Sequence, residues 1–147
     1  MGNINHISYD KDFYAWAMEN AELLRKRKFN ELDIENLAEE IESMGKSDRR
    51  SVLSHLRVLL AHLLKWQYQP EQRSNSWKAS IRNARLQIKQ LIEDSPSLKN
   101  QIPIKLKVTY KEASITASDE TGILEENFPK YCPFTLEQCL NENFWPE

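Results

Sequence analysis

Apolar residues recur three and four positions apart along most of this chain, and this spacing constrains the fold more than any other feature. The clearest example lies in residues 76–94, where Trp77, Ile81, Ala84 and Ile88 fall within one narrow arc of a helix. The alternating pattern typical of strands is nearly absent. We therefore predict an all-α fold, a compact bundle of about five to six helices with short connections.

Capping residues and prolines divide the chain into helical segments. The expected segments are residues 10–27, 33–44, 47–69, 76–94, 103–121 and 135–141. Gly45 stands where a helix C-terminus favours a left-handed residue, and Ser47 can cap the next helix, so we predict a break there. Residues 103–121 are rich in β-branched side chains, but their apolar spacing favours a helix over a strand. Thr135 and Gln138 fit a capping box that opens the last helix.

The length sets the expected number of domains. A chain of 147 residues with 40% hydrophobic residues can form one domain with a real core, and it is short for two. We predict a single helical domain over residues 1–147. Within it we expect a flexible N-terminus, residues 1–8, and a loop plus short C-terminal helix, residues 123–147, that packs on the bundle.

Charge and hydropathy narrow the function classes. Twenty Lys and Arg residues against 22 Asp and Glu residues give a net charge of −2, so the whole chain has no strong attraction for nucleic acid or anionic lipid. The most apolar run, residues 58–64, is far shorter than the roughly 20 residues that span a bilayer. The N-terminus lacks the pattern of a secretory signal. We expect a cytoplasmic protein without a membrane partner or a cofactor.

The two cysteines, Cys132 and Cys139, stand seven residues apart near the C-terminus. They form no CxxC pair, and no histidine follows His62, so the spacing does not favour a zinc site. In a reducing compartment we expect both thiols to be free.

Three glutamates share one ridge of the predicted helix at residues 33–44. Glu35, Glu39 and Glu42 are spaced i, i+4 and i+7, whereas Glu40 lies on the opposite flank; we call the three residues the acidic ridge. Such a ridge could hold a hard cation or raise the carboxyl pKa values into general-base range. Metal sites in helical bundles usually need a Glu-x-x-His pair within a helix, and none occurs here, so we expect no metal.

A second ridge, on the predicted helix at residues 76–94, is basic. It consists of Lys78, Arg82, Arg85 and Lys89, which we call the basic ridge. The two ridges could face each other as an ion-pair ladder, in which each exposed pair contributes at most about 1 kcal/mol. Alternatively, the basic ridge could follow a phosphate backbone while Trp66, Tyr68 and Trp77 stack on bases. We favour the ladder, because the net charge is slightly negative and Trp77 belongs to the apolar arc.

Two further groups of residues are candidates for a site. His62 lies at the border of an apolar arc, where it could act with the acidic ridge as a base or metal ligand; a half-buried ring that covers the core edge is the more ordinary role. Arg73, with Trp66 and Trp77, forms a corner between two helices. Arg73 could bind an anion or stack on an indole, but we favour a structural lock.

Six blocks of sequence carry a family resemblance. They are YDKDFYAWA, LDIENLAEEIESMGKSDRR, HLLKWQYQPEQRSNSW, EDSPSL, ETG and FPKYCPFTLEQCLNENFWPE. Together they resemble the signature blocks of the bacterial, largely cyanobacterial, domain of unknown function number twenty-nine, over nearly the whole chain. The resemblance implies an all-helical stand-alone domain of about this length, and no activity, cofactor or catalytic residue. Lys46, in place of arginine, and the β-branched residues 103–121 depart from the family pattern.

The leading hypothesis is a non-enzymatic helical protein-interaction or regulatory module, whose partner is an unidentified protein or a second copy. The alternative is a small metal-assisted hydrolase or nuclease that uses Glu39, Glu42 and His62. A nucleic-acid-binding module that uses the basic ridge ranks third. An enzyme requires a concave site where the carboxylates and His62 converge, whereas an interaction module requires an exposed apolar patch.

Overall fold

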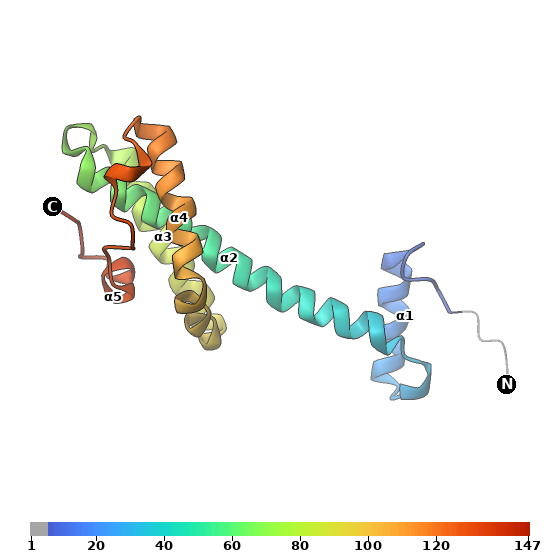
Figure 1. Cartoon of the computed structure of the whole chain (residues 1–147). Coiled ribbons are helices and arrows are strands. Elements are labelled where there is room, and N and C mark those ends of the chain that lie inside the picture. Colours follow the sequence, from blue (N-terminus) through green and yellow to red (C-terminus); the bar gives the residue numbers. More distant parts are fainter. Residues whose placement is uncertain (1–5) are drawn as a thin grey trace. The chain divides into compact units, whose positions relative to one another are not determined.

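The computed structural model describes residues 6–147, and they form helices joined by short turns (Figure 1). The α-helices are α1 (Phe13–Arg25), α2 (Ile34–Tyr68), α3 (Asn75–Asp94), α4 (Gln101–Thr121) and α5 (Leu136–Leu140). Single 3-10 turns precede or follow them: η1 (Phe29–Glu31), η2 (Pro70–Gln72), η3 (Pro96–Asn100) and η4 (Glu125–Asn127). No strand occurs within residues 6–147, so the predicted all-α class is confirmed.

Helix α2 corrects one prediction. It is a single helix of 35 residues that runs through Gly45 and Ser47, so the predicted break at this point is wrong. Glycine inside a helix costs only about 1 kcal/mol relative to alanine, and the apolar spacing continues in phase from Ile41 to Val52. Gly122, in contrast, has a left-handed backbone with a φ of 79° and ends α4.

Two other predictions of local structure are confirmed. The β-branched segment is helical, since α4 covers it up to Thr121. The Thr135 hydroxyl accepts from the Gln138 backbone N–H at 3.0 Å, and the Gln138 side chain accepts from the Thr135 backbone N–H at 3.0 Å. Both halves of the capping box are therefore present.

Packing divides the chain into two compact units, Met1–Lys46 (unit 1) and Ser47–Glu147 (unit 2). Of the N-terminal segment expected to be flexible, residues 1–5 lie outside the described part of the chain. The two residues that follow are held by one carboxylate. Glu19 accepts from the His6 ring at 2.8 Å and from the Ile7 backbone N–H at 3.0 Å, and these two bonds lower the pKa of Glu19.

Unit 1 is a helical hairpin around one buried indole. Trp16 of α1 donates from Nε1 to the Asp33 carboxylate at 2.9 Å, at the point where α2 begins. Asn20, also buried, accepts from the Asp33 backbone N–H at 3.0 Å. The rings of Tyr9 and Phe13 pack against Trp16 with centroid distances of 4.8 and 5.6 Å. These contacts hold α1 against the first turns of α2.

Unit 2 has one hydrophobic core to which three helices and the C-terminal segment contribute. Its fully buried side chains include Leu56, Leu59, Leu60, Leu63, Leu64, Ile81, Ile88, Ile102 and Cys139. Two ion pairs join α2 to α4, Arg57 to Glu112 at 3.9 Å and Lys65 to Glu120 at 2.6 Å. Because the pairs follow the same order on both helices, α2 and α4 run in the same direction (Figure 1).

Candidate functional site

The N-terminal part of α2 exposes the apolar stripe that its C-terminal part buries. Ile34, Ile41 and Met44 are 65%, 63% and 62% exposed, whereas Val52 and Leu59 are buried in the core of unit 2. Ile34, Ile41, Val52 and Leu59 lie within about 20° of one another around the helix at 100° per residue. We call Ile34, Ile41 and Met44 the apolar face of unit 1.

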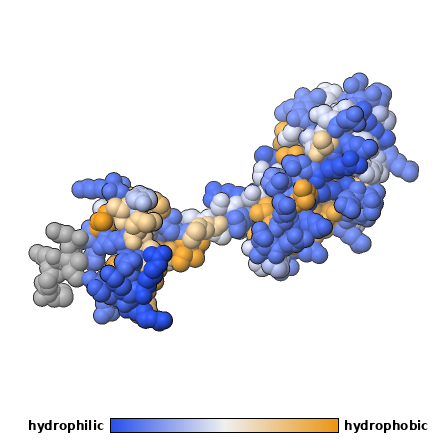
Figure 2. Space-filling model, turned by 180° about the vertical axis from the view of Figure 1, so that it is seen from behind, coloured by the Kyte–Doolittle hydropathy of each residue, from blue (hydrophilic) through white to orange (hydrophobic). Residues whose placement is uncertain are grey.

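Helix α1 adds further exposed apolar side chains to the same unit. Phe13, Tyr14 and Met18 are all at least half exposed. Figure 2 shows hydrophobic residues, in orange, at the surface of this unit. Scattered apolar residues are normal on protein surfaces, but several on one small unit are typical of an interaction surface.

The acidic ridge borders the apolar face. Glu35, Glu39 and Glu42 are all exposed, and Glu42 forms an ion pair at 3.9 Å with Lys46, one turn further along α2. On the opposite flank, Glu40 accepts a hydrogen bond from the Tyr9 hydroxyl, which raises the pKa of Tyr9 to about 12. The basic ridge belongs to unit 2, so an ion-pair ladder between the two ridges stays a prediction.

His62 makes local contacts within unit 2. Its Nδ1 donates to the Val58 carbonyl of the preceding turn at 2.8 Å, and the ring is half-buried at the edge of the core. Burial lowers the pKa of His62, and the nearby charge of Lys65 lowers it further. Glu39 and Glu42 belong to unit 1, so the proposed convergence of His62 with these carboxylates stays a prediction.

The members of the basic ridge have different environments. Arg82 and Lys89 are exposed, and Lys78 is half-buried. Arg85 is only 5% exposed and donates to three backbone carbonyls of the C-terminal segment, those of Cys139 at 2.7 Å, Phe144 at 2.8 Å and Gln138 at 3.3 Å. Burial lowers the pKa of Arg85. Arg85 therefore anchors the chain terminus, and it interrupts the exposed ridge.

The corner around Arg73 is a stack of cations and indoles. The guanidinium of Arg73 lies 5.0 Å from the Trp66 ring centroid, and its Nε donates to the Trp66 carbonyl at 2.8 Å. Trp145 also packs on Trp66, with a centroid distance of 4.7 Å. Trp77 contacts Lys65 instead, whose Nζ lies 4.8 Å from the indole centroid. Sequence reasoning missed Trp145; the Phe144-Trp145 pair near the C-terminus was the available signal.

A cavity of about 730 Å³ lies between α3 and the C-terminal segment. We call it the cationic pocket. Its lining residues are Arg82, Arg85, Leu86, Lys89, Leu140, Asn141, Glu142 and Asn143. Three members of the basic ridge meet there, while Lys78 lies outside. The loop residues Asn141, Glu142 and Asn143 were not predicted as site residues.

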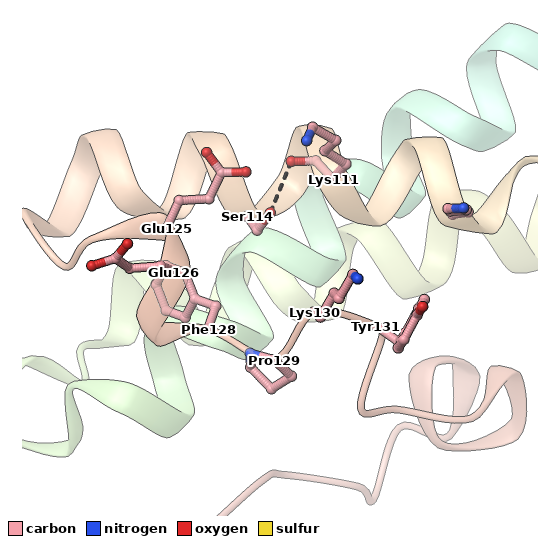
Figure 3. A pocket seen from close by; sticks show the side chains of 9 residues that line it. Lys111, Ser114, Glu125, Glu126, Phe128, Pro129, Lys130 and Tyr131 are labelled. Atoms are coloured by element: carbon pink, nitrogen blue, oxygen red, sulfur yellow. Dashed lines mark hydrogen bonds between the residues drawn. The ribbon is translucent and has the colours of Figure 1, made fainter.

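A second cavity of about 610 Å³ lies between α4 and the segment after η4, and none of the predicted site residues lines it (Figure 3). Its walls carry three lysines and two glutamates, Lys107, Lys111, Lys130, Glu125 and Glu126. The Ser114 hydroxyl at its floor donates to the Lys111 carbonyl at 2.9 Å (Figure 3). The three lysines outnumber the two glutamates by one, so the walls carry only a small net charge.

The model of the family described as "Domain of unknown function DUF29" matches residues 8–145. The chain belongs to the DUF29 family. The DUF29 match confirms the family resemblance inferred from the sequence blocks and includes every candidate site described above. No curated protein and no solved structure matched the chain.

The family description names no activity and no functional residue. Within residues 6–147, no group of three or more His, Cys, Asp or Glu side chains is arranged to hold a metal ion. None of the helices in this described part is long and apolar enough to cross a membrane.

Proposed function

We propose that this chain is a cytoplasmic, non-enzymatic protein-interaction module, and that the apolar face of unit 1 binds a basic amphipathic helix of another protein. The observation that supports this proposal most directly is the exposure of Ile34, Ile41 and Met44, each more than 60% exposed. In the C-terminal part of the same helix, the equivalent stripe is covered by other helices. Partner helices are recognised through apolar anchors that recur along one helix face, and Ile34, Ile41 and Met44 recur in this way at i, i+7 and i+10.

The acidic surface of unit 1 favours a positively charged partner. Residues 1–46 contain ten acidic and six basic side chains, and Glu35 and Glu39 lie exposed beside the apolar face. A basic helix would therefore be attracted and oriented by the surface that it covers. A second copy of this chain would bring another excess of carboxylates to the same surface, which is why we favour a basic partner over self-association.

The test is the binding of two designed amphipathic peptides to the full chain, measured by fluorescence anisotropy. One peptide is built from leucine and lysine, and its counterpart from leucine and glutamate. We expect the lysine peptide to bind and the glutamate peptide not to bind. The double variant Ile34→Ser, Ile41→Ser should weaken binding of the lysine peptide at least about tenfold.

The matched control is Ile104→Ser, Val108→Ser in α4, where the side chains are exposed to a similar degree, 68% and 57%. This control should bind the lysine peptide like the wild type. Equal binding by the Ile34→Ser, Ile41→Ser variant would overturn the proposal. A dimer that sedimentation equilibrium detects in the wild type and not in that variant would replace the basic partner by a second copy.

A further inference from the structure

We infer that the cationic pocket of unit 2 binds a small molecule that carries a phosphate monoester. The inference rests on three features of the pocket: a buried guanidinium without a counter-charge, two further cations beside it, and a volume suited to a small ligand. It is independent of the interaction proposed for unit 1, because it uses only residues of unit 2.

The buried guanidinium is that of Arg85, which lines the pocket and is 5% exposed. Its Nε and Nη2 donate to backbone carbonyls, while Nη1 has no hydrogen-bond partner. Within residues 6–147, no carboxylate forms an ion pair with Arg85. A buried charge without a counter-charge is unfavourable, so an anion bound in the adjoining pocket would stabilise this arrangement.

Arg82 and Lys89 supply two more positive charges at the wall of the pocket. They stand one turn before and one turn after Arg85 on α3, so the three cations span only about 10 Å of helix. Neither forms an ion pair within the described residues. Glu142 is the opposing charge in the pocket. The pocket therefore has an excess of two positive charges.

A phosphate monoester matches this excess, since it is a dianion above its second pKa of about 6. Guanidinium groups present donors in a planar fork that fits phosphate oxygens, and the carboxamides of Asn141 and Asn143 offer further donors at the rim. The Asn141 side chain is already held in place, because its Oδ1 accepts from the Asn143 backbone N–H at 2.9 Å. The site thus combines charge with positioned donors.

The geometry favours a small ligand over a polynucleotide. The volume of about 730 Å³ falls within the range of small-molecule sites. A polynucleotide requires an extended exposed track of cations, but the basic ridge is interrupted at Arg85 and Lys78 lies outside the pocket.

The experiment is calorimetric titration of the full chain with adenosine monophosphate, with adenosine as the uncharged counterpart. We expect saturable binding of the monophosphate with a Kd below about 1 mM and no binding of adenosine. Arg82→Gln, Lys89→Gln should weaken the monophosphate at least about tenfold, whereas Lys78→Gln on the same helix should not. Glu142→Gln should tighten binding, because it removes the opposing carboxylate.

Thermal unfolding distinguishes a variant that has lost binding from one that has lost its fold. The monophosphate should raise the melting temperature of the wild type and of Lys78→Gln, and it should not raise that of the folded Arg82→Gln, Lys89→Gln variant. Absence of saturable binding, or equal binding by that double variant, would overturn the inference. Tighter binding of a single-stranded oligonucleotide without terminal phosphates would also overturn it, in favour of a nucleic-acid site.

Discussion

The Nζ atom of Lys65 lies 2.6 Å from the Glu120 carboxylate, and this ion pair joins α2 to α4 where Lys65 is only 7% exposed. The ammonium group also lies over the Trp77 ring. Lysine is almost never buried to this extent without a partner. The pair therefore sets the register of two helices at the end of the bundle where α4 stops.

We expect Glu120→Gln to lower the free energy of unfolding of unit 2 by about 1 to 3 kcal/mol. The reason is that an uncompensated ammonium group would remain buried; partial exposure of Glu120 keeps the loss below that of a fully buried pair. The measurement is urea unfolding followed by circular dichroism.

The control is Glu112→Gln, also on α4. Glu112 pairs with Arg57 at 3.9 Å, and both side chains are about half exposed, so no buried charge is left behind and the loss should stay within about 0.5 kcal/mol. Equal losses for the two variants would show that the Lys65 pair contributes no more than a surface pair.

The stabilising contribution of the Asp33 carboxylate should depend on pH. Hydrogen bonds from Asn36 and from the Trp16 indole lower the pKa of Asp33 below its ordinary value of 3.8. Its stabilising contribution is therefore complete above this ordinary value, which applies to the unfolded chain, and is lost as pH falls through the lower folded value. The indole N–H resonance of Trp16, followed by nuclear magnetic resonance, should titrate with a midpoint below 3.8.

Asn36→Ala removes the largest cause of that shift, so the midpoint should rise in this variant. Trp16→Phe identifies the resonance by its disappearance. A wild-type midpoint at or above the ordinary value would contradict the stabilisation of the Asp33 carboxylate by these hydrogen bonds.

Local patterns predicted the fold well where each helix carries its own signals. The capping box at Thr135 and the spacing of Ile104 and Val108 both led to the correct helices. The helix break predicted at Gly45 is wrong because a glycine permits a helix end without requiring one. The apolar spacing continues in phase on both sides of Gly45 and outweighs the low helix propensity of glycine.

The candidate sites were less predictable for a different reason. Arg82 and Arg85 carry the same local signal on one helix, yet one is exposed and the other is buried. The difference comes from the C-terminal segment, whose Cys139 carbonyl lies 54 positions further along the chain. Helical spacing places a side chain on a face, but it does not say which distant segment covers that face.

Cys132 should be the reactive thiol of the chain. A hydrogen bond from Cys139 lowers the pKa of Cys132 to about 7, while the pKa of Cys139 is raised and its side chain is buried. Iodoacetamide should therefore alkylate Cys132 first, at a rate that rises with a midpoint near pH 7. Fragment-ion mass spectrometry of the C-terminal peptide distinguishes the two positions.

Cys139→Ala removes the hydrogen-bond donor, so the midpoint for Cys132 should move up towards the ordinary thiol value, whereas Cys139→Ser keeps a donor and should move it less. Faster alkylation of Cys139 in the wild type would contradict the assignment.

Gly45 provides the most direct test of the continuous helix α2. Its backbone is helical, and a Cβ atom added to it would meet nothing within 4 Å. Gly45→Ala should therefore raise the free energy of unfolding by about 0.5 to 1 kcal/mol, through better helix propensity and a less flexible unfolded chain. Gly122→Ala is the matched control: its space is equally open, but its φ of 79° strains an alanine, so it should lower stability by about 1 kcal/mol. If Gly45→Ala lowered stability like Gly122→Ala, Gly45 would be a helix C-terminus after all, and α2 would be two helices.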